Sequence, residues 1–287
     1  MNAEKILECQ VDKEFVHYDS SAKVSVISMA RSFFSEYDLI RLLIKRDFKV
    51  RYRRSLLGMA WSLITPLSTS AVLYFVLSSV FKARLVGGSG YAAFLMAGVI
   101  TINHLNQGGS GAGFSFLANQ GVITKVKTDL LVYPVISVIG SYITFLLGII
   151  PLIFFLLLEN RVPHFSILLV PIIGLPLSIL ILGMGVHVAV LSSRYHDIQG
   201  VMNVVYNVLG YATPVIYPLT VVHGAIKILL QLNPLTEYVQ LIRASCLDSS
   251  YLPRWYWTAY ALIFTIILFF SAIVRLKNNR VRIIESL

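Results

Sequence analysis

The sequence predicts an all-α integral membrane protein with six transmembrane helices, an N-terminal amphipathic interface helix and a re-entrant helical hairpin before the last span. Three observations lead to this fold class: the composition, the spacing of the charged residues, and the uneven distribution of Lys and Arg. The 287-residue chain is 56% apolar and 13% charged, whereas a soluble domain carries about 25% charged residues. Its mean hydropathy of +0.75 therefore indicates a chain that is largely surrounded by lipid.

The charged residues leave six long gaps in the sequence. Asp, Glu, Lys and Arg are absent from residues 55–81, 85–124, 130–158, 162–193, 198–226 and 255–274. A helix needs roughly 20 apolar residues to cross ~30 Å of hydrocarbon. Each gap can hold one crossing, which predicts spans at about 58–81, 91–117, 132–158, 167–191, 199–219 and 255–275.

The basic residues predict the orientation of these spans. With the amino terminus inside the cell, the inner segments carry 18 Lys and Arg and the outer segments carry six. Because cytoplasmic loops are enriched in Lys and Arg, we expect both termini to be cytoplasmic and residues 1–34 to form a cytosolic arm. The net charge of +10 lies mostly beside apolar blocks, where it suits anionic lipid headgroups and not nucleic acid.

A basic amphipathic segment precedes the first span. Over residues 36–55, the apolar residues gather on one side at helical spacing, and Arg41, Lys45, Arg46 and Lys49 fall on the other. An apolar face opposite a basic face is typical of a helix that lies in the membrane interface. An ordinary surface helix of a soluble domain would show the same pattern, but here a membrane span follows.

Residues 220–250 predict a hairpin that does not cross the bilayer. Two short segments, 221–230 and 235–246, are separated by Asn233-Pro234. Neither is long enough to span, and short apolar segments of this kind are better interpreted as re-entrant or interfacial helices.

Three stretches together resemble the ABC-2-type permeases that export polysaccharides, namely the O-antigen, capsule and teichoic acid exporters. The first is the entry to span one, where Arg51-Tyr52-Arg53-Arg54-Ser55 is followed by a Leu-Gly pair, Trp61 and a proline. The second is the Asn-Pro-Leu turn at 233–235, and the third is the Gly-Val-Ile-Thr-Lys-Val stretch at 121–126. The resemblance covers residues 35–287, which we therefore expect to form one ABC-2-type transmembrane domain.

The sequence departs from the family pattern at three places. An aromatic-proline pair usually follows the third stretch, but here Thr128-Asp129 does, with Tyr133-Pro134 later. Two extra residues separate the charges of the motif that begins at Arg194. The family often has a tryptophan near position 104, where this chain has histidine.

The resemblance implies an assembly and a location. Two copies of the chain would form a homodimer, with two separate ABC ATPase subunits docked below, in the bacterial cytoplasmic (inner) membrane. The segment at about 119–130 would be the coupling helix, with its ATPase contacts at Gln120, Gly121, Val122, Ile123, Thr124 and Lys125. The substrate would be a lipid-linked glycan, and ATP would be bound by the partner subunit. We therefore expect no cofactor and no metal in this chain.

The resemblance implies a glycan carried on a polyprenyl diphosphate. The arginines before span one are candidate ligands for that diphosphate. Guanidinium groups bind phosphate oxygens through paired N–H donors, so we expect a role for Arg51, Arg53 or Arg54, with Tyr52 and Trp61 near the first sugars. The alternative is that all three arginines only follow the positive-inside rule.

Aromatic side chains are candidate sugar contacts further along the path. Aromatic rings can pack against the C–H-rich faces of sugars, and Tyr74, Phe75 and Phe114 are expected to contribute in this way. The alternative is that these side chains face lipid or pack against other helices.

Polar and small residues interrupt the second predicted span. His104 lies beside Asn103, Asn106 and Gln107. Polar side chains in hydrocarbon are costly and usually face a neighbouring helix or a wet cavity, and both interpretations stay open here. Gly109 and Gly113 form a small-xxx-small face that predicts close helix packing.

Other function classes are less well supported by the sequence. The chain contains no Gly-x-x-x-x-Gly-Lys-Ser/Thr motif, so we expect it not to be an ATPase or any other enzyme. No Asp or Glu lies within a predicted span, which weakens a proton-coupled secondary transporter. A membrane glycosyl- or phosphotransferase would need clustered carboxylates, but the outer segments carry only Glu159, Glu237 and Asp248, far apart in sequence. An ABC-2 exporter of a smaller lipid or drug remains an alternative.

The predicted topology can be tested with single cysteines at Ser249 and Ser286, in a background that lacks Cys9 and Cys246. An impermeant thiol reagent added to intact cells should label position 249 and leave position 286 unlabelled until the membrane is opened. Labelling of position 286 in intact cells would contradict the topology.

Overall fold

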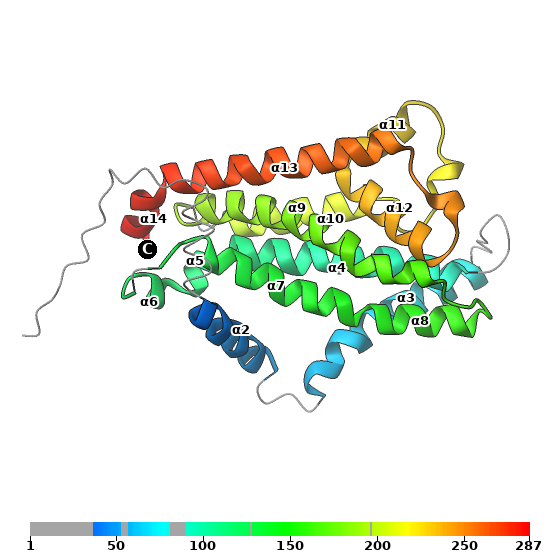
Figure 1. Cartoon of the computed structure of the whole chain (residues 1–287), viewed down its shortest axis with the longest axis horizontal. Coiled ribbons are helices and arrows are strands. Elements are labelled where there is room, and N and C mark those ends of the chain that lie inside the picture. Colours follow the sequence, from blue (N-terminus) through cyan, green and yellow to red (C-terminus); the bar gives the residue numbers. More distant parts are fainter. Residues whose placement is uncertain (1–36, 53–56, 81–89, 127, 196) are drawn as a thin grey trace, which may run out of the picture.

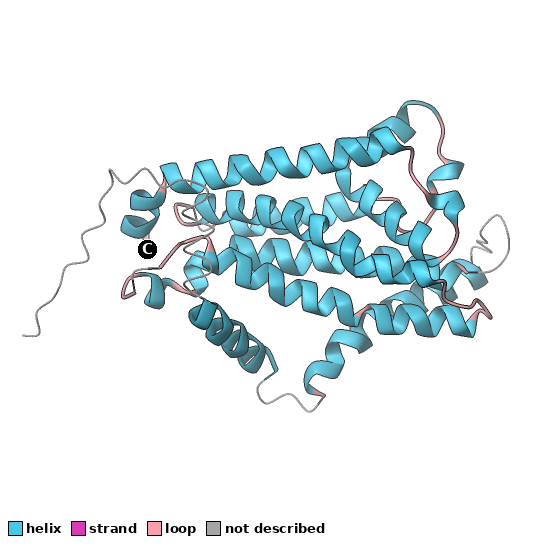
Figure 2. Ribbon diagram, in the orientation of Figure 1, coloured by secondary structure: helices cyan, strands magenta, loops and turns pink. Residues whose placement is uncertain are grey.

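The computed structural model describes residues 37–52, 57–80, 90–126, 128–195 and 197–287, and within these ranges the chain is helical without strands (Figure 2). The long helices run side by side along the long axis of the molecule (Figure 1). One end of this bundle holds α5, α6 and α14, and the other end holds α8 and α11 (Figure 1). Helix α2 lies at an oblique angle to the bundle near the first end.

The elements follow one another in chain order. The first half contains α2 (Tyr37–Tyr52), η2 (Gly58–Ala60), α3 (Trp61–Phe75), a π-helical turn η3 (Val76–Val80), α4 (Tyr91–Gly113), α5 (Ser115–Ala118), α6 (Gln120–Ile123), α7 (Val132–Leu147) and α8 (Ile149–Leu158). The second half contains η4 (Phe165–Leu168), α9 (Leu169–Ser192), α10 (Ile198–Tyr211), η5 (Leu219–Val221), α11 (Gly224–Leu232), α12 (Pro234–Cys246), η6 (Ser249–Tyr251), α13 (Trp255–Asn278) and α14 (Arg280–Ser286).

Four helical stretches in the described residues are long and apolar enough to cross a membrane: Trp61–Ser79, Val132–Leu158, Phe165–Ser192 and Trp255–Asn278. The chain is therefore a multi-pass membrane protein, as the composition predicts. The second and fifth predicted spans correspond to α4 and α10. Helix α4 has 23 residues but contains the polar group around His104. Helix α10 has 14 residues, about 21 Å of helix, and is shorter than the predicted 199–219 because it ends at Tyr211.

Proline explains two interruptions in these helices. Pro151 has no N–H, and its ring conflicts with the carbonyl four residues earlier, which matches the break between α7 and α8 at Gly148. Pro214 likewise prevents α10 from continuing, because the residue before a proline avoids the helical region. The backbone after Tyr211 therefore leaves the helix with carbonyl groups that need other partners.

The segment predicted as a hairpin consists of two helices joined at Asn233. The Asn233 side chain accepts a hydrogen bond from the Leu235 N–H at 3.1 Å, and Pro234 occupies the first helical position of α12, so both residues favour a helix start here. The Asn233 amide also donates to the Thr213 hydroxyl at 3.0 Å. The turn of the hairpin is thereby attached to the segment that follows α10.

A fully buried arginine on α12 binds the same segment. The Arg243 side chain is 0% exposed, and its guanidinium donates to the carbonyls of Pro214 and Val215 at 2.7 Å each and to that of Phe94 at 3.4 Å. Its central carbon lies 3.4 Å from the centre of the Phe94 ring, close enough for a cation–π interaction. Arg243 thus joins α12 to α4 and to the end of α10.

Glycines on α4 allow close helix contacts, as their spacing predicts. A Cβ at Gly109 would lie 2.8 Å from the Tyr206 ring of α10, and a Cβ at Gly113 would lie 2.6 Å from a methyl of Val188 on α9. The small-residue face of α4 is therefore occupied by two neighbouring helices within one chain.

We expect Arg243→Met to lower the apparent melting temperature of the detergent-solubilised protein. The substitution leaves two buried carbonyls without their donors, at a cost of about 1–3 kcal/mol for each unsatisfied group. Thermal aggregation followed by size-exclusion chromatography measures the effect, with Lys227→Met as the control that removes a less buried cation. An unchanged melting temperature for Arg243→Met would show that the hydrogen bonds of Arg243 do not stabilise the fold.

Candidate functional site

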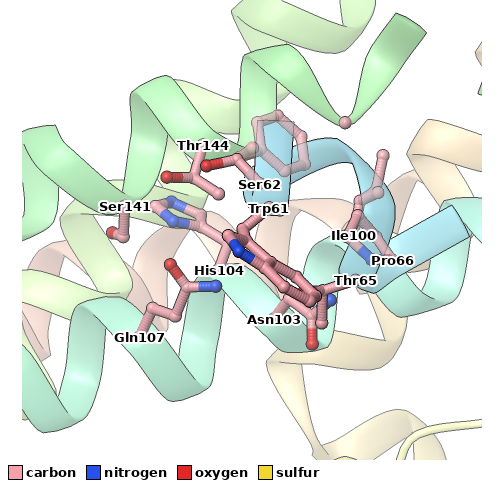
Figure 3. A pocket seen from close by; sticks show the side chains of 12 residues that line it. Trp61, Ser62, Thr65, Pro66, Ile100, Asn103, His104, Gln107, Ser141 and Thr144 are labelled. Carbon is pink, nitrogen blue, oxygen red and sulfur yellow. The ribbon is translucent and has the colours of Figure 1, made fainter. Parts of the chain in front are cut away.

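A cavity of about 330 Å³ lies where α3, α4 and α7 meet (Figure 3). Its lining comes from far-apart parts of the sequence: Trp61, Ser62, Thr65, Pro66, Ile100, Asn103, His104, Gln107, Ser141, Thr144, Phe145 and Gly148. Figure 3 shows Trp61, His104 and Gln107 projecting toward the same space. The volume lies within the roughly 300–1,000 Å³ that is usual for small-molecule sites.

His104 is held in a fixed orientation at this cavity. Its side chain is 2% exposed, and its Nε2 lies 2.9 Å from the Ser178 hydroxyl on α9. The Ser178 hydroxyl donates its proton to the Gly174 carbonyl at 2.8 Å, so it accepts a hydrogen bond from Nε2–H of the imidazole. Nδ1 is then an acceptor, and it has no hydrogen-bond partner among the described residues.

The cavity offers hydrogen bonds without formal charge. Its polar groups are the amides of Asn103 and Gln107, the imidazole of His104, and hydroxyls from Ser and Thr residues. Among the described residues, no Asp, Glu, Lys or Arg lines it. Such a lining can exchange hydrogen bonds with the hydroxyls of a neutral ligand, while the Trp61 indole, 51% exposed, supplies an aromatic face.

A second cavity of about 330 Å³ lies between α3, α4 and the end of α10 and shares Asn103 with the first. Asn106 and Asn207 line it, together with Thr213 and Val215 from the segment that Asn233 and Arg243 bind. One turn of helix further along, Ser110 donates to Asn203 at 2.8 Å. We call the set Asn103, Asn106, Gln107, Ser110, Asn203 and Asn207 the amide face.

Comparison with known proteins identifies the family of the chain. Residues 38–247 match the sequence profile of the ABC-2 type transporter family. The chain belongs to the ABC-2 type transporters. The matched segment includes every helix that lines the two cavities.

Several curated proteins are similar to this ABC-2 chain. Two proteins of Klebsiella pneumoniae named O-antigen export system permease protein RfbA are 25% and 26% identical over 231 residues, which cover 79% of this chain and 88% of each relative. A protein of the same name from Myxococcus xanthus is 23% identical over 222 residues, covering 76% of this chain and 84% of the relative.

The predicted substrate residues of this ABC-2 chain do not form one cluster. Trp61 lines the first cavity. Tyr74 packs against Tyr91 with ring centres 6.4 Å apart, and Phe75 is 66% exposed; both lie near the other end of α3, ~20 Å from Trp61. Phe114 is exposed at the end of α4, so these aromatics do not surround one pocket.

The arginines predicted to bind diphosphate lie at the edge of the described chain. Arg51 and Tyr52 are the last residues of α2, and their side chains are not described. Arg53 and Arg54 lie outside the described residues. Their proposed role therefore stays a prediction.

The predicted coupling segment forms a shorter helix than the sequence predicts. Helix α6 covers only Gln120–Ile123 instead of 119–130. Gln120, Gly121, Thr124 and Lys125 are exposed and Val122 is half-buried, whereas Ile123 is 3% exposed in the main hydrophobic core. Four of the six predicted contact residues are thus available to a partner, and Ile123 attaches the helix to the bundle.

A contact that the sequence did not reveal joins α2 to this segment. The Arg46 guanidinium donates to the Asn119 side chain at 2.5 Å and pairs with Asp47 at 2.8 Å. The Asn119 amide in turn donates to the Ser115 carbonyl at 2.8 Å. Arg46 and Asn119 are 73 positions apart, so nothing local in the sequence could have indicated their contact.

The three carboxylates Glu159, Glu237 and Asp248 have separate positions in the structure and do not form one cluster. Glu159 accepts from the N–H groups of Ala92 and Ala93 at the start of α4, at 2.9 and 3.4 Å. Asp248 accepts from the Ser250 N–H at the start of η6. Glu237 is completely buried, and neither of its oxygens has a hydrogen-bond partner in the described part of the chain. No group of three potential metal ligands occurs among the described residues.

We expect Gly121→Trp to reduce co-purification of an ATPase partner while the chain still folds. A Cβ at position 121 would meet nothing within 4 Å, so the substitution places its bulk on the exposed surface of α6. Ser249→Trp, at an exposed position at the other end, is the matched control. Normal co-purification and normal ATPase coupling of Gly121→Trp would place the docking surface elsewhere.

Proposed function

We propose that this chain is the membrane-spanning permease subunit of an ABC transporter that exports a lipid-linked polysaccharide across the bacterial cytoplasmic membrane. The observation that carries this proposal is the uncharged, hydrogen-bonding cavity around His104, in a chain that belongs to the ABC-2 transporters. The O-antigen export permeases among its relatives support the same substrate class.

The amide face favours a path for sugars over a path for a small apolar molecule. Its side chains present donors and acceptors at helical spacing along α4 and α10. Polar groups within a bilayer need partners. A hydroxyl-rich chain, or water that accompanies it, would supply them.

The proposed assembly is a homodimer with two separate ATPase subunits. Only 17% of the apolar window of α3 is buried within one chain, and α10 exposes Asn203 and Asn207. A second copy that covers these surfaces would enclose the amide face between the two chains. Lipid alone would leave exposed amides in contact with hydrocarbon, which is costly.

The proposed topology has six crossings with both termini in the cytoplasm. Helices α4 and α10 would provide the second and fifth crossings, and the segment after Tyr211 would complete the fifth. Helices α11 and α12 would form the re-entrant hairpin at 220–250 without crossing. The excess of Lys and Arg in the inner segments supports this orientation.

The proposed mechanism starts at the cytoplasmic interface. One or more of Arg51, Arg53 and Arg54 would bind the diphosphate of the lipid carrier, and Trp61 would contact the first sugars. ATP-driven closure of the ATPase pair would act through α6, and through the Arg46–Asn119 contact on α2, at the start of the glycan path. Neutral side chains would then allow the glycan to slide, because no single contact is strong.

Substitution of Asn103 tests the proposed path, because this residue lines both cavities. We expect Asn103→Leu to reduce export of the surface glycan about three- to tenfold, since one net hydrogen bond contributes ~1 kcal/mol, and Asn103→Gln to retain more activity. Surface glycan is measured by antibody or lectin binding, with protein level and ATPase association measured in parallel.

Asn278→Leu is the matched control, because Asn278 is an exposed asparagine at the end of α13, outside both cavities. Normal export by Asn103→Leu would contradict the path. Export of a small lipid instead of a glycan by the intact transporter would contradict the proposed function itself.

A further inference from the structure

A third cavity, of about 470 Å³, lies at the end of the bundle that holds α11 and the start of α13 (Figure 1). It shares no residue with the two cavities of the amide face. The side chains that give it chemical character are Lys227, Gln231, Gln240, Arg254, Tyr256 and Trp257. They come from α11, α12 and the beginning of α13, so the cavity exists only because these three helices meet.

This cavity is positively charged, whereas the lining around His104 is neutral. Lys227 and Arg254 both line it, and no Asp or Glu of the described part of the chain does. Neither cation forms an ion pair with a carboxylate in the described ranges. Arg254 is also the N-cap residue of the 24-residue helix α13, whose start has no side-chain cap, and the N-terminus of a helix favours negative charge.

A buried amide adds a group that can recognise a hydroxyl. Gln240 lines the cavity with only 5% of its surface exposed, and its Oε1 has no hydrogen-bond partner among the described residues. A buried acceptor of this kind is costly unless a donor reaches it. Because this oxygen has almost no accessible surface, the amide would have to turn toward the cavity before a hydroxyl of a bound molecule could satisfy it.

Aromatic rings form part of the wall beside the cations. The rings of Tyr256 and Trp257 lie 5.7 Å apart, and the Tyr256 hydroxyl accepts a hydrogen bond from Arg254 at 3.0 Å. This hydrogen bond holds the Arg254 guanidinium beside the aromatic surface. The cavity thus combines positive charge, a hydroxyl acceptor and apolar ring faces.

We propose that this cavity binds an acidic sugar, with its carboxylate or phosphate at Lys227 and Arg254 and a ring hydroxyl at Gln240. The proposal rests on the proposed function, because the orientation argued there places this end of the bundle outside the cytoplasm. The anion could belong to a sugar of the exported glycan or to the phosphate headgroup of an outer-leaflet lipid. The cavity would then hold the emerging substrate after it has left the neutral path.

Binding of soluble probes to the purified full-length protein in zwitterionic nanodiscs tests the site. The probes are glucose 1-phosphate, glucuronate, glucose and inorganic phosphate, measured by ligand-observed NMR or isothermal titration. We expect both acidic sugars to bind at least tenfold more tightly than glucose and than inorganic phosphate. Arg254→Gln and Lys227→Gln should each weaken acidic-sugar binding at least fivefold, and Gln240→Leu should reduce the preference over inorganic phosphate.

Arg194→Gln is the control, because Arg194 is an exposed arginine that does not line the cavity, and it should leave binding unchanged. Equal binding of glucose and the acidic sugars, or full binding by the Arg254→Gln/Lys227→Gln double variant, would overturn the proposal. Competition by anionic nanodisc lipid that abolishes acidic-sugar binding would assign the site to a lipid phosphate instead. The binding assay needs only the isolated permease, so its outcome does not depend on export. The proposed function is tested separately, by loss of glycan export when the gene is deleted.

Discussion

The contact between Arg243 and the carbonyls that follow α10 is the constraint on which the arrangement of α12 against α4 and α10 depends. Removing a guanidinium from water is costly unless its donors are satisfied. Here the partners are carbonyls of the non-helical segment after α10, at Pro214 and Val215, together with the face of Phe94. The buried guanidinium and these carbonyls satisfy each other's hydrogen bonds, so removing either partner leaves a polar group without one.

This constraint also shapes the proposed substrate path. Arg243 holds Val215, and Asn233 holds Thr213; both held residues line the cavity that Asn103 shares with the His104 site. The hairpin therefore does not line this cavity itself, but it holds two residues of the cavity wall in place. Movement of the hairpin would change the cavity wall directly, since these hydrogen bonds leave the segment little independent freedom.

The sequence predicted the helical fold, the membrane setting and the family, because composition and charge spacing report directly on lipid exposure. The long apolar helices α7–α8, α9 and α13 lie close to the predicted ranges for the same reason. The end of α10 at Tyr211 was missed, because the apolar run continues past Pro214 and hydropathy does not register the lost hydrogen bonds. Gly109 and Gly113 were correctly predicted as a packing face, since only small residues permit such contact.

The candidate site was only partly accessible to sequence reasoning. Trp61 and the polar group around His104 were recognised, but their position in one cavity depends on how α3 lies across α4 and α7. The sequence predicted neither the burial of Arg243, which is one of the six basic residues of the predicted outer segments, nor the burial of Glu237 nor the Arg46–Asn119 contact. Each of these depends on packing between helices distant in sequence, which periodicity and charge counts cannot report.

Photocrosslinking during transport tests the central claim, that a glycan moves along the amide face, most directly. A photoreactive amino acid at position 207 would be activated in cells that synthesise a radiolabelled glycan, with the same amino acid at Leu175, an exposed position on α9 outside both cavities, as the control. The account predicts labelled glycan attached at position 207 and not at 175, and loss of the label when ATP hydrolysis by the partner is blocked. Equal labelling at both positions, or no labelling at 207 during active export, would contradict it.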